Sequence, residues 1–377
     1  MVLAVRDSAA AARFSDPRER CVRQYPTASQ GWEDGPMFAA IEVCRVRAPG
    51  IGRLAFDPDL CQRWPGKLFG RVRGSEDLTV YDLDEGFDGT PRPVAVFPRP
   101  WPDFDDEASA VSPDLRFAVF GGRDRVRAVD RRGTTLWEVP YKLSRWGPEQ
   151  GSCAVTADAA RVWAHVYGLP GSHPEGGDQT SWMVIDAATG RLLAYWLTDC
   201  SERGSVHRLH PDGEHVTIEL GGEASVYGRF TGSGVEVVDL PQREGLDLLV
   251  SLSPNGEHYV ALDEFGGMRR ETFPPGEPGP LLELGEAETI ELLPGFVDDD
   301  RVLVPLVDYE ANRAEHVLVS ASDLSRLGPV RYPFGDVSED LVVNALGDGT
   351  WLTGARRDDD ADELFRWRLA DGRVRRP

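Results

Sequence analysis

Residues 204–240, GSVHRLHPDGEHVTIELGGEASVYGRFTGSGVEVVDL, contain the unit that the rest of the chain repeats. A run ending at Leu209 leads into a Pro-Asp-Gly turn, in which proline presets φ and the Asp-Gly pair tolerates a tight reversal. An alternating run, 215–220, follows the turn, and another run, 235–240, comes after a glycine-rich segment. The stretch therefore predicts three short strands, with the glycine-rich segment between the second and third as a hairpin.

Turns of the same kind recur along the whole chain. Their acidic or asparagine residues stand at 59, 114, 158, 212, 255, 300 and 348, so successive turns are 43 to 55 residues apart. Such spacing is typical of propellers, in which a four-stranded blade takes about 40 to 50 residues. An apolar run follows each turn, and several are apolar on both faces, as expected for a sheet packed between two others. These predicted second strands are 68–72, 117–120, 162–167, 216–220, 259–262, 302–307 and 351–352.

A further set of runs, each with an acidic or polar exit, predicts the next strand of each unit. Six copies of this run can be recognised, whereas four prolines interrupt the copy near residues 268–284. The six predicted strands are 79–82, 127–130, 183–186, 236–239, 316–320 and 365–371.

The segment 186–190, Asp-Ala-Ala-Thr-Gly, matches an Asp-x-x-Thr-Gly hairpin. With the Pro-Asp-Gly-type turns, it makes residues 37–377 resemble bacterial β-propellers of the WD-repeat-like and quinoprotein-like kind. Seven turn markers then predict an all-β fold: a single seven-bladed β-propeller of four-stranded antiparallel blades. The Gly-His and Trp-Asp dipeptides of WD repeats are absent, so the resemblance concerns the fold and implies no ligand chemistry.

The N-terminal region divides at about residue 36. Residues 1–36 do not fit the repeat and are expected to form a short extension, whereas 37–47 alternate between two faces as a strand does. The C-terminal residues after the last predicted strand are too short to supply an outer strand. We therefore expect residues 37–47 to pair with the last blade and close the ring.

Composition restricts the class of protein and partner. The chain has 377 residues, of which 41% are hydrophobic, so one repeat domain with an ample core accounts for nearly all of it. The net charge of −22 disfavours nucleic acid and anionic membranes and favours a basic or amphipathic protein or peptide. Five widely spaced cysteines and an early charge in the N-terminal segment predict free thiols in a cytoplasmic protein, expected to be a monomer.

Histidines provide the candidate chemistry. His210 and His215 flank the Pro-Asp-Gly turn, but a metalloprotease motif needs both histidines on one helix face, and this turn forbids the helix. His165 alternates with bulky residues and is expected to be a hydrogen-bonded core histidine. His207 and His210, beside a predicted central strand, are weak catalytic candidates, and neither a metal nor a cofactor is assigned.

The predicted binding rim consists of loop residues on one face, where tryptophans stand beside charges. Such a rim suits recognition, because an aromatic side chain can anchor a contact while charges speed the encounter. The candidate binding residues are Trp101, Asp103, Phe104, Asp105, Asp106, Glu107, Arg145, Trp146 and His173.

Two functions remain open at this level. The first is a non-enzymatic scaffold that binds a protein or peptide through these loops, favoured because no catalytic constellation repeats with the fold. The alternative is an enzyme, a hydrolase or lyase, with a site at the mouth of the central channel. That site would use His207, His210 and carboxylates, with or without a divalent metal.

Overall fold

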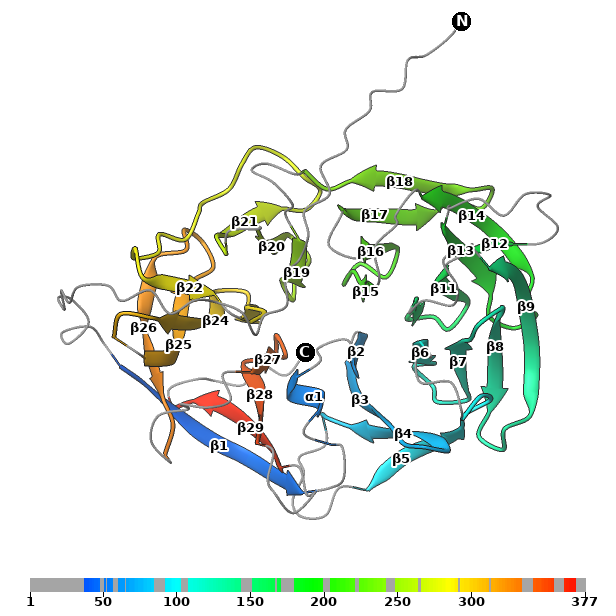
Figure 1. Cartoon of the computed structure of the whole chain (residues 1–377), viewed down its shortest axis with the longest axis horizontal. Coiled ribbons are helices and arrows are strands. Elements are labelled where there is room, and N and C mark those ends of the chain that lie inside the picture. Colours follow the sequence, from blue (N-terminus) through cyan, green and yellow to red (C-terminus); the bar gives the residue numbers. More distant parts are fainter. Residues whose placement is uncertain are drawn as a thin grey trace, which may run out of the picture.

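The computed structural model shows an all-β protein whose sheets follow one another around a common centre (Figure 1). The single helix in the described part of the chain is the four-residue α1 (Arg53–Phe56). The predicted extension, residues 1–36, lies outside the described residues. Those are 37–47, 51, 53–56, 60–64, 66–84, 92–102, 108–143, 151–166, 168–170, 180–198, 204–220, 224–241, 248–263, 266–290, 292–311, 313–333, 342–355 and 363–370.

The first four sheets are antiparallel, and apart from one short strand added to the second sheet their strands pair in chain order. The first contains β2 (Cys61–Trp64), β3 (Lys67–Arg73), β4 (Asp77–Asp82) and β5 (Pro93–Pro98). The second contains β6 (Ala108–Val111), β7 (Phe117–Gly121), β8 (Arg125–Asp130) and β9 (Thr135–Leu143), with β12 (Gly168–Pro170) added beside β9. The third contains β10 (Ser152–Val155), β11 (Arg161–Val166), β13 (Thr180–Asp186) and β14 (Leu192–Thr198). The fourth contains β15 (Ser205–Leu209), β16 (His215–Leu220), β17 (Ala224–Phe230) and β18 (Val235–Asp239).

The remaining strands form a three-stranded sheet and a larger curled one. The three-stranded sheet contains β19 (Leu248–Leu252), β20 (His258–Leu262) and β21 (Met268–Thr272). One part of the curled sheet contains β22 (Glu288–Ile290), β23 (Gly295–Asp298), β24 (Arg301–Asp308), β25 (Arg313–Ser320) and β26 (Arg326–Arg331). The other part contains β27 (Val343–Ala345), β28 (Thr350–Ala355), β29 (Glu363–Leu369) and β1 (Phe38–Arg47).

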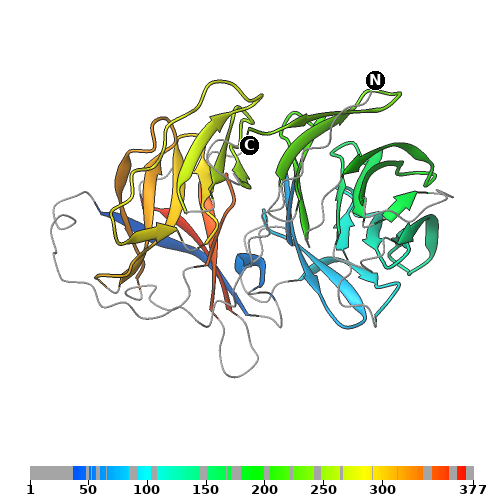
Figure 2. The same ribbon diagram turned by 45° about the horizontal axis from the view of Figure 1, so that its top comes forward.

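Strand β1 joins the two ends of the described chain in one sheet (Figure 2). It pairs antiparallel with β29, from Ala40 opposite Leu369 to Arg47 opposite Glu363. Its even-numbered side chains turn inward and its odd-numbered ones outward, so that Ala40, Cys44 and Val46 are buried. The predicted pairing of residues 37–47 with the last strands is therefore present. A short parallel pairing with β26 joins β1 to the other part of the curled sheet.

The prediction of three strands in residues 204–240 was wrong, because the stretch contains four. The segment interpreted as a glycine-rich hairpin includes β17, and the predicted third strand at 236–239 belongs to β18, the fourth. Gly228 lies within β17 and interrupts the apolar pattern by which a strand is recognised. A Cβ at this position would lie 2.8 Å from the Trp182 ring, so the strand needs glycine where the indole of the neighbouring sheet packs.

Neighbouring sheets pack through clusters of buried apolar side chains. Trp163 and Trp182 of the third sheet, for example, pack with Ile218 of the fourth, with the two indole rings 4.6 Å apart. One such cluster joins the last strands of the chain to the first sheet. In it Val46 and α1 lie with apolar side chains of β28, β29 and β3.

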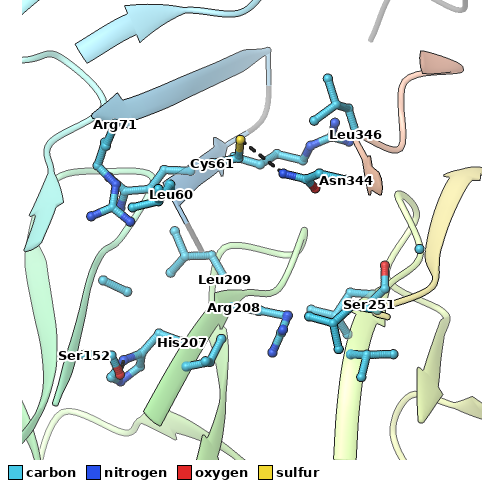
Figure 3. Close-up of a pocket in the computed structure, with 18 of the residues that line it drawn as sticks. Leu60, Cys61, Arg71, Ser152, His207, Arg208, Leu209, Ser251, Asn344 and Leu346 are labelled. Atoms are coloured by element: carbon cyan, nitrogen blue, oxygen red, sulfur yellow. Dashed lines mark hydrogen bonds between the residues drawn. The ribbon is translucent and has the colours of Figure 1, made fainter. Parts of the chain in front are cut away.

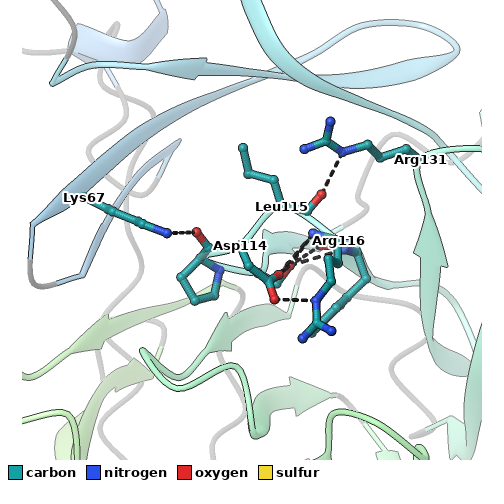
Figure 4. A network of polar contacts seen from close by, with 8 residues as sticks. Lys67, Asp114, Leu115, Arg116 and Arg131 are labelled. Atoms are coloured by element: carbon teal, nitrogen blue, oxygen red, sulfur yellow. Dashed lines mark hydrogen bonds and ion pairs between the residues drawn. The ribbon is translucent and has the colours of Figure 1, made fainter.

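The repeated turn between the first and second strands has a common hydrogen-bond pattern in four sheets. The amide of its fourth residue donates to the carbonyl of its first at 2.8 to 3.0 Å, and the fourth residue has a positive φ. In the second sheet, Lys67 from the first sheet and Arg131 donate to the carbonyls of Pro113 and Leu115, tying the turn to its surroundings (Figure 4). The fourth residues are Leu115 (56°), Ala159 (54°), Gly213 (75°) and Gly256 (75°).

Candidate functional site

A cavity of about 520 Å³ lies at the centre of the sheets (Figure 3). Its wall includes residues of the innermost strands β2, β6, β10, β15, β19 and β27, together with residues 293–295 at the start of β23. Because one edge strand of every sheet contributes, residues far apart in the sequence share this space.

Positive charge gathers in the cavity. Arg63, Arg71, Arg73 and Arg208 line it, and no aspartate or glutamate is found among the described residues that do. Burial lowers the pKa of Arg63, against the opposite effect of the nearby Asp348 and Asp84 carboxylates. A guanidinium remains charged at any ordinary pH, so all four arginines carry positive charge in this wall.

Two of these arginines enter from different sheets. Arg71, on β3, is 5% exposed and donates through Nη1 to the carbonyl and, at 3.1 Å, to the hydroxyl of Ser109. Arg208, on β15, is half-buried. Figure 3 shows both side chains extending toward the space between the sheets. These arginines bring positive charge to the cavity of a chain that is acidic as a whole.

His207 lines the same cavity and has both ring nitrogens engaged. Its Nε2 lies 2.7 Å from the indole Nε1 of Trp182, and its Nδ1 lies 2.5 Å from Oγ of Ser152. An indole N–H can only donate, so Nε2 must accept and the neutral ring must carry its proton on Nδ1. His207 therefore donates to Ser152 and cannot accept the proton of that hydroxyl.

The hydrogen bonds continue from Ser152 into the protein. Ser152 Oγ lies 2.8 Å from Ser205 Oγ, which lies 3.0 Å from Nδ1 of His165. Nε2 of His165 lies 2.9 Å from Oγ1 of Thr180. We call these residues, with His207, the cavity-wall relay. His165 is 1% exposed with both nitrogens engaged, which confirms the prediction of a hydrogen-bonded core histidine.

Both histidines of the relay are neutral near pH 7. Burial lowers the pKa of His165 to about 3. The pKa of His207 lies well below its usual range, first because of burial and second because His165 is close by. The relay therefore consists of uncharged donors and acceptors beside the arginines.

His210 lies three residues beyond His207 and belongs to a different environment. Its Nε2 donates to the carbonyl of Gly256 at 2.8 Å, and its ring stacks on Phe273 with 4.2 Å between centroids. It is not among the described residues that line the cavity. The two catalytic candidates from the sequence are therefore not brought to one site.

His210, Asp212 and His215 form the one group in the described chain whose ligand atoms could hold a metal ion, all within 4.8 Å of one another. Hydrogen bonds of the turn already use these atoms. Asp212 Oδ2 lies 2.6 Å from His215 Nδ1 and 3.0 Å from His210 Nδ1. Burial would raise the pKa of Asp212, but hydrogen bonds from the amide and ring of His215 and the amide of Glu214 lower it well below its usual range.

Comparison with the other turns explains this group. In the equivalent turns, the first residue is Ser112, Thr156 or Ser253, and its hydroxyl donates to the Asp or Asn two residues later at 2.6 to 2.8 Å. His210 stands at that first position, but its Nδ1 accepts from the amide of Asp212 at 3.2 Å, because its Nε2 carries the proton donated to Gly256. The arrangement is therefore a histidine version of the repeated turn.

Of the predicted rim residues, the structure describes only Trp101. Its half-buried ring lies under the guanidinium of Arg127, 4.7 Å from the ring centroid. A Cβ on Gly122 would lie 2.6 Å from the indole, so the ring rests directly on that backbone. The rest of the rim lies outside the described residues, namely Asp103, Phe104, Asp105, Asp106, Glu107, Arg145, Trp146 and His173.

The arginines and serines of the cavity were missed by sequence reasoning. A usable signal exists, because otherwise apolar innermost strands carry polar residues such as Ser109, Ser152, Ser205, Ser251 and Asn344. A polar residue on a strand packed between other elements indicates that it faces a cavity or a polar partner.

No protein-family model matches this sequence, and a search of curated proteins gives no match either. Within the described residues, none of the helical structure has the length and apolar character needed to cross a membrane.

Proposed function

We propose that the chain is a closed seven-bladed β-propeller that acts as a non-enzymatic binding scaffold in the cytoplasm. Two observations support the closed ring. β1 pairs with β29, and the apolar cluster around α1 packs the last strands against the first sheet. Asn344 reinforces this contact, since its amide donates to the carbonyl of Leu54 at 2.9 Å.

Closure is tested by deletion from the N-terminus. Removing residues 1–48 takes away β1 and leaves the edge of β29 unpaired, so we expect loss of cooperative folding. Removing residues 1–30 leaves β1 in place and should cost much less. Equal thermal stability of the two truncated proteins would contradict the closed ring.

The tautomer of His207 is the observation that favours a scaffold over an enzyme. A serine nucleophile needs a neighbouring base that can accept its proton, whereas His207 donates to Ser152. The described cavity residues also offer no carboxylate as a substitute base. Metal analysis of the purified protein tests the alternative: stoichiometric zinc, manganese or calcium would favour the channel-mouth hydrolase or lyase.

The partner proposed for the scaffold is a basic or amphipathic protein or peptide, bound by a monomer through the rim that contains Trp101. The net charge of −22 suits such a partner better than nucleic acid or an anionic membrane. A buried tryptophan contact can contribute about 2 kcal/mol or more, whereas an exposed carboxylate contributes under about 1 kcal/mol.

A pull-down from native cell extract tests the rim. We expect Trp101→Ala to lose partners that the wild type retains, while Leu136→Ala, which removes an exposed side chain on β9, keeps them. Because Trp101 also packs on Gly122, the melting temperatures of all three proteins are compared first. An identical set of retained proteins, or a retained nucleic acid, would exclude this rim as the binding surface.

A further inference from the structure

We infer that the central cavity is a binding site for a small organic anion with phosphate or carboxylate groups. The site is distinct from the rim proposed above, and its ligand differs in charge from the partner proposed there. Three features carry the inference: the arginines, the polarity of the relay and the size of the space.

The arginines supply the charge. Arg71 and Arg208 reach the cavity from β3 and β15, and Arg63 and Arg73 add to the same wall. Guanidinium groups match the planar or tetrahedral oxygens of carboxylate and phosphate better than any other side chain does. In a chain with 63 acidic and 41 basic residues, the described wall of this cavity carries four arginines and no aspartate or glutamate, which favours an anionic ligand over a cationic one.

The relay supplies a directed hydroxyl. A serine hydroxyl donates once and accepts twice, and Ser152 already accepts from Nδ1–H of His207. If Thr180 donates to His165, His165 to Ser205 and Ser205 to Ser152, the proton of Ser152, which lines the cavity, is left for a ligand. An anion there would select this arrangement, because each donor in the chain strengthens the next.

The volume limits the ligand. A cavity of about 520 Å³ falls in the range of sites for small molecules, about 300 to 1,000 Å³. It is too small for a folded partner or a nucleic-acid strand.

Isothermal titration of the full chain tests the site, with pyrophosphate and citrate as probes at an ionic strength fixed with sodium chloride. We expect at least one anion to bind the wild type with a Kd of about 1 mM or lower. Arg208→Gln should weaken that binding about tenfold or more. Pyrophosphate and citrate distinguish a phosphate from a carboxylate ligand.

The matched control is Arg229→Gln, which removes the same charge from an exposed position on β17, where Arg229 pairs with Glu236. It should leave the Kd within about twofold, whereas general electrostatics would change both variants equally. Ser152→Ala, which changes no charge, should weaken binding about threefold or more and replaces Arg208→Gln if that variant does not fold.

The inference is overturned if neither anion binds the wild type at about 10 mM, or if Arg208→Gln or its replacement binds as the wild type does. It is equally overturned if Arg229→Gln loses as much affinity as Arg208→Gln. Failure of the rim pull-down would leave these results unchanged, so the two proposals are tested separately.

Discussion

His207 and His210 are three residues apart, yet their rings lie in different environments. His207 faces the cavity and is held neutral between its two uncharged hydrogen-bond partners, Trp182 and Ser152. His210 faces a turn and lies beside the carboxylate of Asp212. His207 lies on β15 and His210 directly follows this strand, yet the two rings contact different groups. The chemistry of each ring is therefore set by its neighbours and not by its place in the sequence.

The largest predicted effect is on the pH dependence of the free energy of unfolding, because His165 and Asp212 lose their contributions in different pH ranges. The folded pKa of His165, about 3, lies below its unfolded value of about 6.5, so the unfolded chain takes up the proton first as the pH falls. The relay therefore loses stability between about pH 6.5 and 3, at about 1.4 kcal/mol per pH unit and up to about 5 kcal/mol in total for His165. Asp212, whose pKa is lowered, loses its contribution only below about pH 4.

Urea unfolding at successive pH values measures this difference. His165→Gln should reduce the loss of stability between pH 6 and 4, to which His207 still contributes, and leave the contribution of Asp212 below pH 4 intact, whereas Asp212→Asn should reduce only the loss below pH 4. A wild-type slope for His165→Gln would show that this ring is not neutral and buried in the folded protein.

Two glycines in equivalent turns test how tightly His210 is packed. Gly213 and Gly256 share a φ of +75°, but a Cβ meets nothing within 4 Å at Gly213 and lies 2.6 Å from the His210 ring at Gly256. Gly213→Ala should cost about 1 kcal/mol for the backbone alone, and Gly256→Ala about 2 to 4 kcal/mol because of the added clash. Adding His210→Ser should reduce the cost of Gly256→Ala, and equal costs for the two glycines would mean that His210 is free to move.

The tautomer of His207 can be tested through its donor. Trp182→Phe removes the indole N–H from a buried acceptor, so we expect a loss of about 1 to 3 kcal/mol in the free energy of unfolding. Nitrogen NMR should show the proton on Nδ1 in the wild type and a mixture of tautomers in the variant. Trp367→Phe, which removes a similar indole bond to Thr353 at 2.8 Å, should leave His207 unchanged. A wild-type proton on Nε2 would contradict the assigned tautomer.

The smallest effect is expected in a turn of the same type that has no histidine. Ala159 has a φ of 54°, which L-residues other than glycine adopt at a cost of about 1 to 2 kcal/mol. Ala159→Gly removes this strain but adds backbone freedom to the unfolded chain, so we expect a net gain of about 1 kcal/mol or less. A lower melting temperature would indicate that the methyl group stabilises the turn.

The sequence predicts the periodic parts of the fold well. The seven predicted second strands overlap β3, β7, β11, β16, β20, β24 and β28, since turn residues and apolar runs are local signals. β17 was missed because Gly228 interrupts its pattern, and only the packing of Trp182 from another sheet explains that glycine.

The site was less predictable for a related reason. His207 was selected from the sequence, but its partners Ser152 and Trp182 belong to the neighbouring sheet. The arginines that line the cavity come from three strands, β2, β3 and β15, and nothing in their local sequence indicates that these strands share a space. Which polar residues face the centre depends on how the sheets assemble.

The pairing of β1 with β29 also has a consequence for the order of synthesis. Arg47 is made 316 residues before its partner Glu363, a delay of roughly 15 to 60 s at ribosomal speeds of about 5 to 20 residues per second. During that time β1 is an apolar strand with both edges unpaired, and a second nascent copy or a chaperone can pair with it before its own sheet exists. The polysome, where such copies are concentrated, is therefore where this chain is most exposed to pairing between molecules.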